Sequence, residues 1–159
     1  MTLEETLERW RRGAETRANA HQGAATFDRT LYSILAYSTP VFALLGASTL
    51  LTSSVGPAAP GLAQTAAVCS LVAAVTSGLL AVRDLQESEE KHRKDAADYT
   101  AWQMDVERVL VNAGEGQRPA DDEMKRLIKE HKELDARPLG APAWIYSRAR
   151  RAVGKPAVT

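Results

Sequence analysis

The chain has 159 residues, and its 20 Lys and Arg balance its 20 Asp and Glu, so the formal net charge is zero. That length allows one ordinary domain or a small membrane protein. The neutral balance argues against a strongly basic nucleic-acid-binding protein, and we expect no nucleic-acid partner. The single cysteine, Cys69, excludes a disulfide framework and any multi-cysteine metal site.

Residues 1–29 are predicted to form a cytoplasmic amphipathic helix. Its apolar and small residues recur every three or four positions and so share one helical face: Leu3, Leu7, Trp10, Ala14, Ala18, His21 and Ala25. Thr2 and Glu5 have the spacing of a capping box. No proline separates this helix from the apolar run that follows, so we expect the two to be nearly continuous.

The middle of the chain carries no charge. No Asp, Glu, Lys or Arg stands between Arg29 and Arg83. Residues 30–52 and 61–83 are apolar runs of roughly 22 residues, or about 33 Å of helix each, which matches a hydrocarbon core of about 30 Å. Two prolines and a glycine in residues 53–60 predict a tight extracytoplasmic turn. We therefore predict an all-α membrane protein, a two-transmembrane helical hairpin with long helical cytoplasmic extensions.

Two other interpretations fit the middle segment less well. A buried hairpin in a soluble bundle needs a polar face towards water, which Ser, Thr and Ala provide only weakly. A cleaved signal peptide would have a shorter apolar core that begins earlier. Arg and Lys flank both spans and are absent from the turn, so the chain is expected to lie in the cell inner (plasma) membrane as a multi-pass protein with both termini cytoplasmic.

Residues 84–112 are predicted to continue the second span as a cytoplasmic helix. One face holds Leu85, Ser88, His92, Ala96, Tyr99, Gln103, Val106 and Leu110. An antiparallel hairpin sets His21 and His92 at a similar height, so these two residues and Tyr99 are candidates for contact between cytoplasmic helices. Interhelical hydrogen bonding, a pH-sensitive contact, and metal binding with ligands from other subunits all stay open for the histidines.

Residues 113–159 are predicted to form C-terminal cytoplasmic helices and a basic tail. Pro119 opens a helix that carries apolar residues and a histidine on one side, namely Met124, Leu127, Ile128, His131 and Leu134. Trp144 then precedes a cluster of cations, Arg148, Arg150 and Arg151. Either these four residues lie on an anionic membrane surface, or Trp144 and Ile145 pack against the other helices.

No arrangement of residues indicates catalysis. The chain has no glycine-rich phosphate loop, and its three histidines stand far apart in sequence without metal-ligand spacing. We therefore expect no enzyme activity, no cofactor and no bound metal. The spans contain no ionisable Asp, Glu, Lys, Arg or His, which argues against a proton-coupled transporter. Cys69, inside the second span, is interpreted as a small packing residue.

The spans do carry small and hydroxyl-bearing residues. Small residues that let helices approach closely in lipid are predicted to mediate packing: Ala66, Ala67, Ala73, Ala74 and Gly78. The candidates for lining a pore are Ser33, Tyr37, Ser38, Ser48, Gln64, Ser70 and Ser77. One hairpin encloses no pore, so conduction requires a homo-oligomer in the lipid bilayer. Ordinary interhelical hydrogen bonding is the other interpretation of the hydroxyls.

The layout resembles the SLATT family, two-transmembrane effector domains found with nucleotide-second-messenger synthases and SLOG sensor domains in bacterial conflict systems. The resemblance rests on the Ala20-His21 helix entering the first span, the tight hairpin, and the exit of the second span into residues 90–99. It covers roughly residues 10–112. It implies a membrane pore that kills or arrests the infected cell, with a trigger supplied by a separate sensor protein, because this chain contains no synthase or SLOG domain.

Two functions therefore compete. The first is an oligomeric pore-forming effector of a bacterial defence system, gated by its cytoplasmic helices. The second is a membrane-anchored interaction module that conducts nothing. The polar residues of the spans separate the two hypotheses, because an anchor does not need them.

Overall fold

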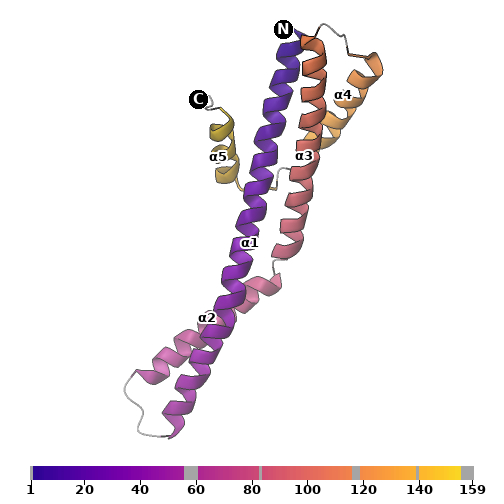
Figure 1. Ribbon diagram of the computed structural model, residues 1–159. Helices are drawn as coiled ribbons and strands as arrows, with labels where there is room; N and C mark the ends of the chain where they lie inside the picture. The colour runs from indigo at the N-terminus through magenta and orange to yellow at the C-terminus, as the bar shows by residue number, and fades with distance from the viewer. Residues whose placement is uncertain (1, 56–60, 83, 116–118, 139, 155–159) are drawn as a thin grey trace. The chain divides into compact units, whose positions relative to one another are not determined.

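The computed structural model describes residues 2–55, 61–82, 84–115, 119–138 and 140–154. They form α1 (Leu3–Val55), α2 (Leu62–Val82), α3 (Leu85–Gly114), α4 (Asp121–Asp135) and α5 (Ala143–Val153) (Figure 1). All regular structure in these residues is helical, as predicted. The chain divides into two compact units. We call Met1–Thr26 with Glu89–Thr159 the helical unit, and Phe27–Ser88 the hairpin unit.

The start of α1 confirms the predicted capping box. The backbone N–H of Glu5 donates to Thr2 Oγ1 at 3.2 Å, and the backbone N–H of Thr2 donates to Glu5 Oε2 at 2.9 Å. These reciprocal bonds satisfy N–H groups that the helix itself leaves without partners. From Leu3 the helix runs without a break to Val55, with Pro40 inside it, so the predicted continuity is also confirmed.

The core of the helical unit lies between the first part of α1, α3 and α4. Its buried members are Leu7, Ala14, Ala18, Tyr99, Trp102, Val106, Val109, Leu127 and Leu134. The predicted face of α1 is confirmed for its central residues, whereas Leu3 at its start is exposed. Small alanines on this face leave room for the large rings of α3. The packing therefore pairs a small-residue surface with an aromatic one.

The buried face of α3 differs in part from the predicted one. Tyr99 and Val106 are buried as expected, but Gln103 is only half-buried and Trp102 is buried in its place. A helix of 3.6 residues per turn lets either neighbour occupy the edge of a stripe, and the larger apolar side chain takes the interior. The indole Nε1 of Trp102 donates to the carbonyl oxygen of Leu127 at 3.2 Å, so its polar atom is satisfied.

The short helices α4 and α5 each contribute two buried residues to the helical unit. In α4 these are Leu127 and Leu134, while Ile128, predicted on the same side, is 37% exposed. In α5 the buried residues are Ile145 and Ala149. A Cβ built on Gly23 of α1 would lie 2.9 Å from Ile145 Cγ2, so α5 packs closely against α1 at that glycine.

In the hairpin unit α1 pairs with α2 through small and hydroxyl-bearing residues. Thr39 Oγ1 donates to Thr76 Oγ1 at 2.9 Å. A Cβ on Gly46 would lie 2.9 Å from Ser70 Oγ, and 3.5 Å from the carbonyl oxygen of Ala66. Ala66 is accordingly buried, as a close approach of two helices requires.

The second apolar helix does not run on into α3. It ends at Val82, and Asp84 begins a new helix by accepting a hydrogen bond from the backbone N–H of Glu87 at its Oδ1, 2.9 Å away. An N-cap aspartate of this kind favours a helix start at that point, which the apolar periodicity did not reveal. The predicted turn overlaps α1 as far as Val55, and its residues 56–60 lie outside the described residues, as does Arg83.

Candidate functional site

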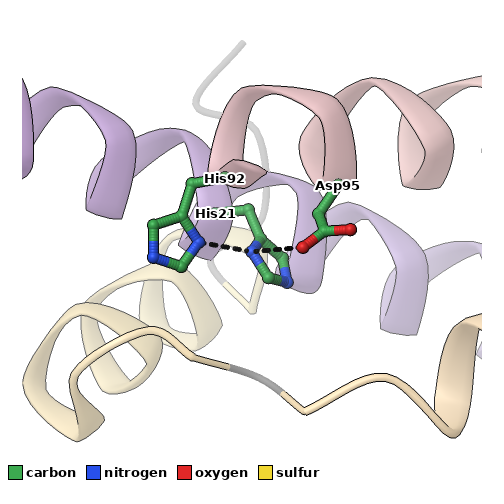
Figure 2. Close-up of side chains that lie close together, drawn as sticks. All are labelled: His21, His92 and Asp95. Carbon is green, nitrogen blue, oxygen red and sulfur yellow. Dashed lines mark hydrogen bonds and ion pairs between the residues drawn. The ribbon is translucent and has the colours of Figure 1, made fainter. Parts of the chain in front are cut away.

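Two histidines and an aspartate meet inside the helical unit. His21 comes from α1, and His92 and Asp95 come from successive turns of α3 (Figure 2). The Nδ1 atoms of the two histidines lie 3.0 Å apart, and His21 Nδ1 lies 3.9 Å from Asp95 Oδ2. All three residues are buried, with exposed fractions of 1%, 7% and 8%. We call these three residues the His–Asp cluster.

Arg137 holds the aspartate of the cluster from the other side. Its Nη1 donates to Asp95 Oδ1 at 3.0 Å and to Asp98 Oδ2 at 2.6 Å. Asp95 therefore uses one carboxylate oxygen for Arg137 and turns the other towards His21. These contacts fix the orientation of the carboxylate and offset much of the cost of burying its charge.

The ring of His21 is positioned by an aromatic neighbour. It stacks on Tyr99 with ring centroids 5.7 Å apart and an interplanar angle of 19°. The Tyr99 hydroxyl is itself fixed, because it donates to the carbonyl oxygen of Leu134 at 2.8 Å and accepts from Arg17 Nη1 at 3.2 Å. Arg17 also pairs with Asp135. The stack and these bonds restrict rotation of the imidazole.

The backbone at Gly140 closes against the ring of His92. A Cβ built on Gly140 would lie 3.1 Å from His92 Cε1, and the glycine has a φ of +54°. Side chains rarely adopt that conformation, so glycine is favoured for two independent reasons. The sequence after α4 thus provides a cover for the cluster.

Burial lowers the pKa of His21 below its ordinary value, because the charged imidazolium would lose its hydration. The charge of Asp95 raises the pKa of His21, whereas the charges of His92, Arg17 and Arg137 lower it further. At neutral pH His21 is therefore neutral, with one ring nitrogen carrying a lone pair. A neutral imidazole can accept a hydrogen bond or bind a metal ion at that nitrogen.

The sequence predicted part of this arrangement. The structure brings His21 of α1 into contact with His92 and Tyr99 of α3. The sequence pattern indicates no metal-ligand spacing, because the histidines are far apart along the chain. It does not reveal that α1 and α3 bring His21 and His92 together. It also missed Asp95, although the spacing from His92 places both on one face of α3. Asp95, the third potential metal ligand beside the two histidines, thus comes from the same chain and not from another subunit.

The hairpin unit presents the other notable surface. Two helices, in segments Leu3–Leu51 and Leu62–Ala81, are long enough and apolar enough to cross a membrane. Only 6% of the apolar stretch of the first segment is buried, and only 11% of that of the second. The core helix of a soluble protein, in contrast, is mostly buried. Large apolar side chains stand exposed, among them Leu44 at 71% and Leu71 at 65%. Such a surface is typical of contact with lipid or with other copies.

The exposed surface of α2 has two chemically different faces. Residues that recur at intervals of three, four or seven form a face of small side chains: Ala63, Ala67, Ala74, Gly78 and Ala81. The neighbouring face carries large apolar side chains: Val68, Leu71, Val75 and Leu79. We call these the small face and the large face of α2. Of the predicted packing residues, Ala66 faces α1, Ala73 is half-buried, and Ala67, Ala74 and Gly78 lie on the small face.

The pore-lining candidates do not share one surface. Ser70 lies against Gly46 in the helix contact. The hydroxyls of Ser33, Ser38 and Ser48 donate to carbonyl oxygens three or four residues earlier in their own helix. Ser70 is nevertheless exposed, and the other exposed candidates are Tyr37, Ser48, Gln64 and Ser77. The threonine pair that joins the helices, Thr39 and Thr76, was not among the candidates.

The proposed membrane-surface residues of α5 are exposed. Trp144 is 55% exposed, and Arg148, Arg150 and Arg151 are all exposed. Of the two residues in the packing alternative, Ile145 is buried and Trp144 is not, so the apolar anchor of α5 in the helical unit is the isoleucine. Membrane contact by Trp144 and the arginines stays a prediction.

No family model, curated protein or solved structure matches this chain.

Proposed function

We propose that the protein is an oligomeric membrane effector whose hairpins assemble into an ion-conducting pore. The observation that carries this proposal is the division of exposed α2 into a small face and a large face. A lipid anchor needs only large apolar side chains. A small face left uncovered by the chain's own helices suits close contact with another helix, since lipid association is driven by packing at small residues.

The hairpin also supplies polar groups for a water-filled path. Tyr37, Gln64 and Ser77 are exposed within one chain. Ser77 lies three residues after Ala74 and four before Ala81, so it borders the small face, whereas Gln64 lies four and seven residues before Val68 and Leu71 and shares the large face. In this proposal the large face of α2 meets lipid, the small face meets the next subunit, and Tyr37 and Ser77 face the lumen.

The topology in this proposal follows the flanking cations. Arg29 precedes the first span and is exposed, and further Arg and Lys residues follow the second span, so both termini lie in the cytoplasm of an inner (plasma) membrane protein. The helical unit is then cytoplasmic and available to a separate sensor protein. A role in bacterial defence, as the SLATT resemblance implies, belongs to the same proposal.

One observation favours the alternative, a membrane-anchored module without conduction. The hydroxyls of Ser33, Ser38 and Ser48 are hydrogen-bonded to their own helix, so they need no water. Serine bonded in this way is common in helices that face lipid or protein. The alternative predicts a protein that inserts and recruits partners but never makes a membrane leaky.

The test is a pair of substitutions on adjacent residues of α2. Ala74→Leu enlarges the small face, whereas Val75→Leu changes the large face by one carbon. We expect wild type and Val75→Leu to sediment as oligomers in detergent and to release ions from liposomes. Ala74→Leu should sediment as a smaller species and release far less. A monomeric wild type, or liposomes that stay sealed at every protein density, would contradict the pore and support the anchor.

A further inference from the structure

We infer that His21, His92 and Asp95 form a binding site for a divalent transition metal ion of the zinc class. The site lies wholly within the helical unit and does not depend on the proposed pore. Its three ligands would be two imidazole nitrogens and one carboxylate oxygen, a set that suits Zn²⁺, Co²⁺ and Ni²⁺. The ion would join α1 to α3.

The distances fit this chemistry. Four-coordinate zinc with bonds of about 2.0–2.1 Å places its ligand atoms roughly 3.3 Å from one another. The observed separations of 3.0 Å between the two Nδ1 atoms and 3.9 Å from His21 Nδ1 to Asp95 Oδ2 lie on either side of that value. The three ligand atoms all lie within 4.8 Å of one another. Binding of an ion would draw Asp95 closer to the two histidines, because the longer separations exceed about 3.3 Å.

The surroundings of the ligands resemble the support that metal sites need. Arg137 holds the far oxygen of Asp95, and Tyr99 stacks on the ring of His21. Such outer contacts orient the ligands and commonly change metal affinity by about 10–100-fold. The backbone at Gly140 covers His92. The ligands are therefore held in place and shielded from bulk water before any ion arrives.

The local charge also suits a dication. A metal ion binds imidazole in its neutral form and carboxylate in its ionised form, so the three ligands would present a net charge of −1 to a bound ion. The neighbouring cations are each paired with acids, Arg17 with Asp135, and Arg137 with Asp95 and Asp98. Three protein ligands leave a fourth position, which in zinc sites is filled by water or by an added ligand.

Without an ion, one proton shared between the two Nδ1 atoms accounts for their 3.0 Å separation. The experiment therefore decides between a permanent histidine pair and a metal site. The full chain, prepared in detergent without a histidine tag and freed of metal by a chelator, is titrated calorimetrically with Zn²⁺. It is also titrated with Co²⁺, whose visible absorption reports tetrahedral coordination.

We expect one ion per chain. His21→Gln and His92→Gln should weaken binding by at least about tenfold, because direct ligands matter no less than the outer contacts. His131→Gln is the matched control, since it removes the remaining histidine from the same unit and should bind as wild type does. A wild type that binds no ion, or equal binding by His21→Gln and wild type, would overturn the proposal.

A substitution that preserves ligation separates loss of the site from loss of the fold. His92→Cys keeps a metal ligand on the same turn of α3, and it should retain Co²⁺ and add a thiolate-to-cobalt charge-transfer band. The same substitution in a Cys69→Ala background excludes the native thiol as its source. Bound cobalt without that band would overturn the assignment of His92.

Discussion

Gly46 of α1 lies so close to Ser70 of α2 that a Cβ on the glycine would be only 2.9 Å from the serine hydroxyl oxygen. A second glycine of the hairpin unit, Gly78, has no atom within 4 Å of a Cβ built on it in the same way. These two glycines therefore differ in purpose within one chain. Gly46 permits the hairpin to close, and Gly78 leaves its surface open.

Gly46→Val is expected to destabilise the hairpin by about 1–3 kcal/mol, since it forces side chain and backbone apart in a packed contact. Gly78→Val is the control, because a Cβ built at that position has no atom of the same chain within 4 Å. Thermal unfolding in micelles, followed by far-ultraviolet circular dichroism, measures both. Equal losses in the two variants would show that valine acts through the helix backbone and not through the contact.

The hydroxyl pair between Thr39 and Thr76 predicts a measurable coupling. Each hydroxyl also lies within hydrogen-bond distance of a carbonyl oxygen of its own helix, Thr39 at 2.7 Å from Leu35 and Thr76 at 2.9 Å from Val72. Each hydroxyl has one proton, so when Thr39 donates to Thr76, only Thr76 donates to its own helix. A single change to Val leaves the other threonine that carbonyl as partner, so each single change costs little. A double-mutant cycle should give about 0.6 kcal/mol, the usual size of a hydrogen bond between membrane helices. Combining Thr39→Val with Ser48→Ala should give no coupling, because Ser48 bonds to its own helix.

Gly140 and Gly13 predict opposite responses to alanine. Gly140→Ala should destabilise the helical unit by about 1 kcal/mol or more, because φ is positive and the new Cβ would press on His92. Gly13→Ala should stabilise it by roughly 0.5–1 kcal/mol, since the glycine is inside α1 with open space around it. Denaturant titration compares the two with wild type. A stabilising Gly140→Ala would contradict the close cover over the His–Asp cluster.

The helical unit is expected to lose stability in mild acid through His131. Its ring centroid lies 4.9 Å from that of Trp102, on which it stacks, and 5.1 Å from that of Trp10. Burial lowers the pKa of His131 below the ordinary 6.5. The unfolded chain therefore binds this proton more readily than the folded chain. Stability from this residue is complete above pH 6.5 and is lost as pH falls from there through the lower pKa of the folded state.

The check compares melting temperatures at pH 7.5 and pH 5.5 for wild type and for His131→Gln. The fall in melting temperature should be smaller in the variant. Glu8 does not confuse the comparison, because Arg11 lowers the pKa of that carboxyl to about 2, so it stays ionised throughout. An equal fall in both proteins would mean that His131 titrates at its ordinary pKa.

The sequence predicted the helices better than the site. The apolar runs, the capping box at Thr2 and the end of α3 near Gly114 all depend on neighbouring residues, so local patterns revealed them. The break at Asp84 was missed because apolar periodicity continues on both sides of it. Asp95 was missed for a different reason. It lies among alternating charges typical of a solvated surface, and only the packing of α1 against α3 shows that it is buried.

The cluster of Trp10, Trp102 and His131 has a practical consequence. The chain's three tryptophans all lie in the helical unit, and residues 27–88 contain none. Tryptophan fluorescence, excited selectively over that of tyrosine, therefore reports on that unit alone. The exposed indole of Trp144 can be removed by changing it to Phe, which leaves the two packed indoles as the only tryptophan emitters. Any change in tryptophan emission on adding a candidate partner protein would then be read from the packed core, without a contribution from the hairpin unit.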